Sequence, residues 1–126
     1  MIELHGVAGL ALAVVKAFLA ASRGGDFDAL LALLDPEVVL QADGAAVAQC
    51  ASGDVRGAAA VAATFAGRAR AAQRALVNGA AALVWAPGGR PRVVFRFTIV
   101  RGKIVAIDML ADPARLGQLD IAFLEG

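Results

Sequence analysis

The sequence has few of the side chains on which most catalytic and metal sites are built. Its 126 residues include one cysteine, one histidine and no tyrosine. A single cysteine, Cys50, permits neither an internal disulfide nor a cluster of thiolate ligands for zinc, and we expect it to be a buried, inert thiol. A single histidine, His5, excludes a metal site with two histidines, and a catalytic pair would have to recruit it from the N-terminal end. We therefore expect no metal, no cofactor and no catalytic residue.

Charge is also scarce, and it is balanced. The chain has 12 Lys and Arg against 11 Asp and Glu, a net charge of +1, and only 18% of its residues are charged. A nucleic-acid-binding protein needs a marked basic excess, so we expect no direct contact with nucleic acid. Arg68, Arg70 and Arg74 fit a solvated helix face. The longest apolar run, 6–15, is shorter than the about 20 residues of a membrane span, which predicts a cytoplasmic chain with no membrane contact.

Apolar residues, by contrast, are abundant, at 60% of the chain. The length suits one domain that can bury a core of its own. We place this domain at 7–120, between short tails at 1–6 and 121–126. Because so few charged residues are available to cover the surface, we expect an apolar patch for a partner.

The first half of the chain has helical patterning. The predicted elements are helices over 7–23, 26–34 and 58–73, and a short strand over 38–41. The first helix is apolar around most of its circumference, which is typical of a helix that contacts more than one surface. Asp26 has the position and chemistry of an N-cap. Asp43 and Gly44 form a turn signal, and Asp43 fits either a turn residue that caps its own backbone or a contact to a pocket or partner.

The second half alternates between apolar and polar residues, as strands do. We predict one strand over 76–85 interrupted at Asn78-Gly79, a hairpin of strands 92–100 and 104–110 about the turn 101–103, and a short final helix after Asp112-Pro113. The predicted inward residues are Val93, Phe95, Phe97 and Ile99 on one strand and Val105, Ile107 and Met109 on the next. They include no acid or base, and Arg96 and Asp108 fall on the opposite face, where they can pair across the strands.

Helices followed by an antiparallel meander make an α+β chain. The order resembles the cone-shaped nuclear transport factor 2-like fold in its SnoaL-like branch, with N-terminal helices packed on a curved antiparallel sheet. The residues that carry this resemblance are 33–38, the Val55-Arg56-Gly57 segment and the hairpin 97–104. Segments 75–84, 102–110 and 112–116 further resemble the C-terminal SnoaL-like domain of SigJ-type extracytoplasmic-function sigma factors.

That resemblance implies a regulatory, non-catalytic domain that modulates transcription initiation. Its expected partners are the sigma-factor core regions or RNA polymerase, together with a homodimer through the open sheet face, where Val94, Thr98 and Val100 offer apolar contacts. The residues that correspond to the family's partner-contact segments are Asp43, Gly44, Asp112, Pro113 and Leu116.

The alternative is a stand-alone protein that uses the interior of the cone for an apolar small molecule, either as a binder or as a polyketide-cyclase-like or isomerase-like enzyme. The pocket-lining residues would then be Asp43, Trp85, Phe95, Phe97, Ile107 and Met109. In this case proton transfer would depend on Asp43 or on another group that the patterning does not identify, because the inward strand faces are apolar.

Overall fold

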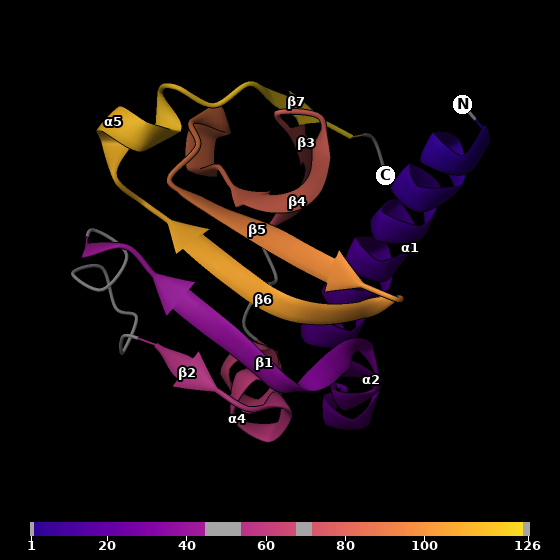
Figure 1. Cartoon of the computed structure of the whole chain (residues 1–126). Helices are drawn as coiled ribbons and strands as arrows, with labels where there is room; N and C mark the ends of the chain where they lie inside the picture. The colour runs from indigo at the N-terminus through magenta and orange to yellow at the C-terminus, as the bar shows by residue number, and fades with distance from the viewer. Residues whose placement is uncertain (1, 45–53, 68–71, 125–126) are drawn as a thin grey trace.

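A computed structural model describes residues 2–44, 54–67 and 72–124, and the side chains from Leu10 onward within these ranges. Helices cover one face of a curved, seven-stranded sheet, which is an α+β fold (Figure 1). The elements are α1 (Ile2–Gly24), α2 (Phe27–Leu33), β1 (Leu34–Ala42), β2 (Val55–Arg56), α4 (Ala58–Phe65), β3 (Gln73–Val77), β4 (Ala80–Trp85), η1 (Pro87–Gly89), β5 (Val93–Val100), β6 (Lys103–Leu110), α5 (Pro113–Leu116) and β7 (Ile121–Phe123). Cys50, Arg68 and Arg70 lie outside the described residues, so the expectations for them stay predictions.

The second and third helices begin within one residue of the predicted positions, whereas α1 begins five residues early and the third helix ends early. The N-cap of α2 is Asp26, whose carboxylate accepts a hydrogen bond from the N–H of Ala29 at 3.1 Å, as predicted. The prediction of a helix up to Gln73 is wrong, since α4 ends at Phe65 and Gln73 is the first residue of β3. Gly67 adopts a φ of 75°, in the left-handed region that a helix cannot continue through.

The sheet is mixed, whereas the sequence predicted an antiparallel one. Its strand order is β2-β1-β6-β5-β4-β3-β7, and β1 runs parallel to its neighbour β6 while every other pair is antiparallel. Strands joined by a tight hairpin must be antiparallel, but β1 and β6 are linked only through the intervening elements and are free to pair in parallel. This pairing places the end of β1 beside the end of β6.

Two tight turns close the hairpins of the sheet. The prediction of a single interrupted strand at Asn78-Gly79 is wrong, because these residues form the turn between β3 and β4 with φ angles of 50° and 82°. Positive φ at both positions is the requirement of the two-residue hairpin turn that Asn-Gly favours. The predicted hairpin of β5 and β6 is confirmed, with φ angles of 53° at Arg101 and 78° at Gly102.

The main core lies between the helices and the inner face of the sheet. Phe18 of α1 is fully buried. The centroid of its ring lies 5.0 Å from the ring centroid of Phe65 and 5.2 Å from that of Phe97, and both pairs have edge-on geometry. A register shift between Thr98 and Ile99 alters the inward set on β6. As a result Ile104, and not the predicted Val105, is buried in this core.

A second apolar cluster occupies the outer face of the sheet, beneath the last segment of the chain. Its buried residues are Ala75, Val77, Ala82, Val84, Val94, Leu110 and Leu116, and Leu119 and Ile121 pack against them. Val94 is therefore buried and does not offer the open contact that the sequence predicted for it, whereas Thr98 and Val100 are exposed. Regular structure also extends into both predicted tails, since α1 begins at Ile2 and β7 pairs with β3.

Candidate functional site

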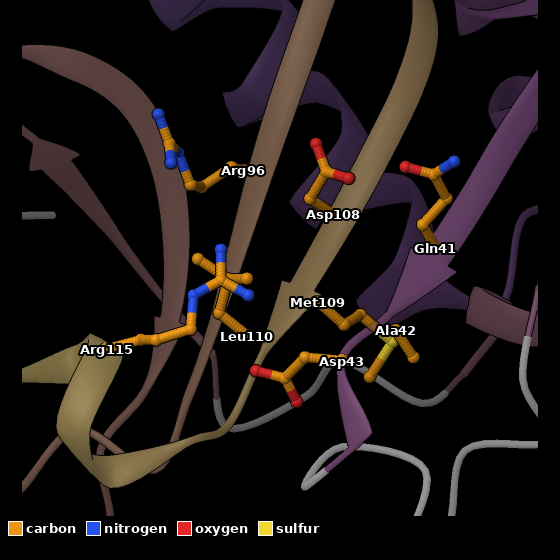
Figure 2. Close-up of a pocket in the computed structure, with 8 residues that line it drawn as sticks. All are labelled: Gln41, Ala42, Asp43, Arg96, Asp108, Met109, Leu110 and Arg115. Carbon is orange, nitrogen blue, oxygen red and sulfur yellow. The ribbon is translucent and has the colours of Figure 1, made fainter.

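The outer face of the sheet carries a polar pocket next to α5. Its volume is about 390 Å³, and it opens to solvent. Figure 2 shows the side chains that line it: Gln41, Ala42, Asp43, Arg96, Asp108, Met109, Leu110 and Arg115. β1, β5 and β6 form the floor, and Arg115 reaches over it from α5.

Three of the polar side chains form one row across the sheet. Gln41 of β1 is the register partner of Asp108 of β6, and Asp108 is the partner of Arg96 of β5. Register partners point to the same face, with Cβ atoms about 5 Å apart, while the next residue along each strand points to the other face. The parallel pairing of β1 and β6 therefore brings an amide, a carboxylate and a guanidinium together on the outer face.

Asp43 closes one end of the pocket and connects β1 to α5. Its carboxylate accepts hydrogen bonds from the backbone N–H of Ala111 at 2.9 Å and of Asp112 at 3.1 Å. Its own N–H donates to the carbonyl of Met109 at 3.0 Å. Asp112 in turn is the N-cap of α5, with its carboxylate accepting from the N–H of Ala114 at 3.1 Å. These bonds fix the position of α5, and with it the position from which Arg115 extends.

The remaining charges of the pocket are not paired with each other. Within the described part of the chain, Arg96, Asp108 and Arg115 have no ion pair or side-chain hydrogen bond, and Asp108 is half-buried. In Figure 2 the guanidinium groups of Arg96 and Arg115 lie on one side of the pocket, and the carboxylate of Asp108 and the amide of Gln41 lie on the other. The pocket thus has a positive side and an electron-rich side.

The residues predicted to line a pocket are divided between the two faces of the sheet. Asp43 and Met109 are among the residues that line the outer pocket, although Met109 also packs against the main core, whereas Trp85, Phe95, Phe97 and Ile107 do not line the pocket. Phe95, Phe97 and Ile107 belong to or pack against the main core, and the ring of Phe95 lies 5.8 Å from that of Phe65. Trp85 is 38% exposed at the end of β4.

The predicted partner-contact residues come together from two distant segments. The bond from Asp112 to Asp43 places Gly44 and Pro113, both exposed, next to this junction. Leu116 is different, because it is 9% exposed and packs in the outer cluster. It supports α5 from below and does not present a surface to a partner.

Sequence reasoning missed Gln41 and Arg115. Gln41 is in β1, two positions before Asp43, which directly follows that strand, so the two-residue period of an extended chain places both on one face. Arg115 could not be found in this way, since its reach into the pocket depends on where α5 packs. No group of described residues has the composition of a metal site, and none of the described helices is long and apolar enough to cross a membrane.

No protein-family model and no curated protein sequence matches the chain. Solved structures do. The extracytoplasmic function sigma factor SigJ of Mycobacterium tuberculosis matches with a TM-score of 0.66 and 28% identity, over 85% of this chain and 44% of SigJ. A nuclear transport factor 2-like protein from Burkholderia xenovorans LB400 matches with a TM-score of 0.57 and 16% identity, over 94% of this chain and 97% of that one. The chain has the nuclear transport factor 2-like fold.

This domain resembles the C-terminal domain of SigJ and spans less than half the length of that sigma factor. The same fold also occurs in an LEH-like epoxide hydrolase of Mycobacterium tuberculosis, which matches with a TM-score of 0.53 and 23% identity over 83% of this chain and 84% of the hydrolase. Because a sigma factor and an enzyme share the nuclear transport factor 2-like fold, the fold alone does not decide the role of this domain.

Proposed function

We propose that this domain is a regulatory module that modulates transcription initiation by contacting protein, either the core regions of a sigma factor or RNA polymerase. The observation that carries the proposal is the match to SigJ, at 28% identity over 85% of this chain. The proposal places the domain in the cytoplasm, where polymerase works, and leaves DNA contacts to other regions. A net charge of +1 agrees with this division.

The junction of Asp43 and Asp112 is the proposed contact surface. Two segments that the resemblance to sigma factors associates with partner contact meet there through the hydrogen bond from Asp112 to Asp43. The surface is well defined because α5 is both capped by Asp112 and supported by Leu116. A rigid surface loses little conformational entropy when a partner binds, which favours recognition.

The packing of the inner sheet face supports a non-catalytic role. An enzyme of the polyketide-cyclase or isomerase kind would need an acid or a base in the interior of the cone. The inner side chains of β5 and β6 are Phe95, Phe97 and Ile107, and they pack against α1 and α4. The carboxylate of Asp43 is bound to two backbone N–H groups that fix a loop.

Regulation would follow from exchange between two sets of contacts. If the junction binds the sigma-factor core in one state and releases it in another, the two states differ in their access to polymerase. The free-energy difference between them sets how strongly this domain changes transcription.

Binding of the purified chain to sigma-factor regions and to core polymerase, both from the organism that encodes it, tests the proposal. Gly44→Glu adds a charged side chain at the junction without a steric conflict, since a Cβ there meets nothing within 4 Å. Gly24→Glu, at the end of α1, has the same open surroundings and is the matched control. We expect saturable binding to one partner, weakened at least tenfold by Gly44→Glu and unchanged by Gly24→Glu. Absence of binding to both partners, or equal effects of the two variants, would contradict the proposal.

A further inference from the structure

The outer pocket is lined by side chains of both charge signs, with Arg96 and Arg115 exposed and Asp108 half-buried. Arg96 and Arg115 approach it from β5 and α5, and Asp108 lies between Arg96 and Gln41 in the cross-strand row. Among the residues that the structure describes, none forms an ion pair with these three charges. A half-buried carboxylate such as Asp108 loses part of its hydration, and a partner in the pocket would compensate for that loss.

Ligands of one charge sign fit the pocket poorly. A phosphate or other dianion could bind the two guanidinium groups, but the carboxylates of Asp43 and Asp108 line the same pocket and would repel it. A metal cation would meet the opposite problem, because Arg96 and Arg115 would repel it. The arrangement favours a molecule that carries both signs.

We propose that the outer pocket binds a zwitterionic small molecule of the α-amino acid class. Its carboxylate lies between the guanidinium groups of Arg96 and Arg115, which suit bidentate recognition of a carboxylate. Its ammonium group donates to the carboxylate of Asp108 and to the amide oxygen of Gln41, which in Figure 2 is on the side of Asp108. A volume of about 390 Å³ accommodates an amino acid with a small or medium side chain.

Such a ligand would act on the junction described above, since Arg115 belongs to α5 and Asp43 lines the pocket. Holding Arg115 against the sheet would restrain α5 in the position set by Asp43. The site does not depend on the proposed role in transcription, and each of the two proposals can fail without the other.

Three probes test the carboxylate and the ammonium group of the ligand separately, and they distinguish a free amino acid from the terminus of a peptide. L-alanine carries both charges, N-acetyl-L-alanine carries only the carboxylate, as a peptide C-terminus does, and L-alanine amide carries only the ammonium group, as a peptide N-terminus does. Titration of the isotope-labelled chain is followed by NMR at the amides of Arg96, Asp108 and Arg115. We expect L-alanine to bind with a Kd on the order of 1 mM, as an open site allows, and each blocked analogue to bind at least tenfold more weakly.

Variants then assign the contacts. Arg96→Gln and Asp108→Asn should each weaken L-alanine binding at least tenfold, while Arg101→Gln, an exposed arginine in the hairpin turn of the same two strands, should leave it unchanged. Sedimentation at the titration concentrations records whether the pocket is instead covered by a second copy of the chain. Four results would each overturn the proposal: equal binding of the three probes, no binding of L-alanine, loss of binding in Arg101→Gln, or a dimer that buries the pocket. The probe comparison in the unmodified chain decides the matter even if a variant fails to fold.

Discussion

The carboxylate of Asp43 accepts a hydrogen bond from the backbone N–H of Asp112, 69 positions further along the chain, at 3.1 Å. Asp112 uses its own carboxylate to cap α5, so two aspartates in succession connect the end of β1 to the start of that helix. The sequence allowed Asp43 to be a turn residue that caps its own backbone or a contact to a pocket or partner. In the structure its carboxylate binds two distant backbone N–H groups, and Asp43 also lines the outer pocket, while a contact to a partner stays a prediction. Asp43 is thereby the residue that joins the pocket to the proposed contact surface.

Asp43→Ala should destabilise the chain by about 2 kcal/mol, because it leaves the N–H groups of Ala111 and Asp112 without their charged acceptor. Urea denaturation followed by circular dichroism measures the change in the free energy of unfolding. Asp28→Asn, an exposed residue of α2, is the control and should change it by less than about 0.5 kcal/mol. Equal stability of Asp43→Ala and the unmodified chain would show that the bond to Asp112 contributes nothing.

Asp112→Ala should cost about 1 kcal/mol through loss of the N-cap of α5. Since Asp43 and Asp112 act on the same loop, the double variant should be less destabilised than the sum of the single variants. The same urea denaturation, run as a double-mutant cycle, measures this coupling. Strict additivity would mean that the two aspartates act independently.

Phe18→Ala should be among the most destabilising substitutions, at about 3–5 kcal/mol, because it removes a fully buried ring that contacts Phe65 and Phe97. Phe27 provides a matched control with the same change of residue. It is 38% exposed at the start of α2, and Phe27→Ala should cost about 1 kcal/mol or less. Thermal unfolding should separate the two variants clearly, and similar midpoints would place the core elsewhere.

Gly102→Ala should destabilise the hairpin of β5 and β6 by about 1–2 kcal/mol, because Gly102 has a φ of 78° that an alanine adopts only with strain. Gly24→Ala is the contrasting case, since Gly24 ends a helix, has open space at its Cβ position and has no positive φ. It should leave stability unchanged or raise it by up to about 1 kcal/mol. A higher unfolding midpoint for Gly102→Ala than for Gly24→Ala would contradict the turn geometry.

Local signals in the sequence predict much of this fold. The N-cap at Asp26, the end of α1 near Gly25 and the turn at Arg101-Gly102 each depend on a few adjacent residues, and the structure has them where the sequence places them. The turn at Asn78-Gly79 is equally local, but apolar residues continue on both sides of it, and this pattern favours one strand over the two that the structure has.

Features that depend on distant partners could not be predicted in this way. The parallel pairing of β1 with β6 follows from how the whole sheet assembles, and it alone brings Gln41 beside Asp108. The register shift at Thr98 that moves Ile104 into the core has no local signal either. Residue patterning therefore predicts individual helices, strands and turns. The outer pocket, by contrast, arises from the pairing of strands and from the packing of α5.

Promoter-dependent transcription in vitro tests the proposed function most directly. Transcript yield is measured with core polymerase and sigma-factor regions from the organism that encodes this chain, at increasing concentrations of the chain. We predict a saturable change in yield of at least severalfold, which Gly24→Glu preserves and Gly44→Glu, at the junction of Asp43 and Asp112, abolishes. A yield that stays the same at every concentration of the chain would contradict a regulatory role in transcription.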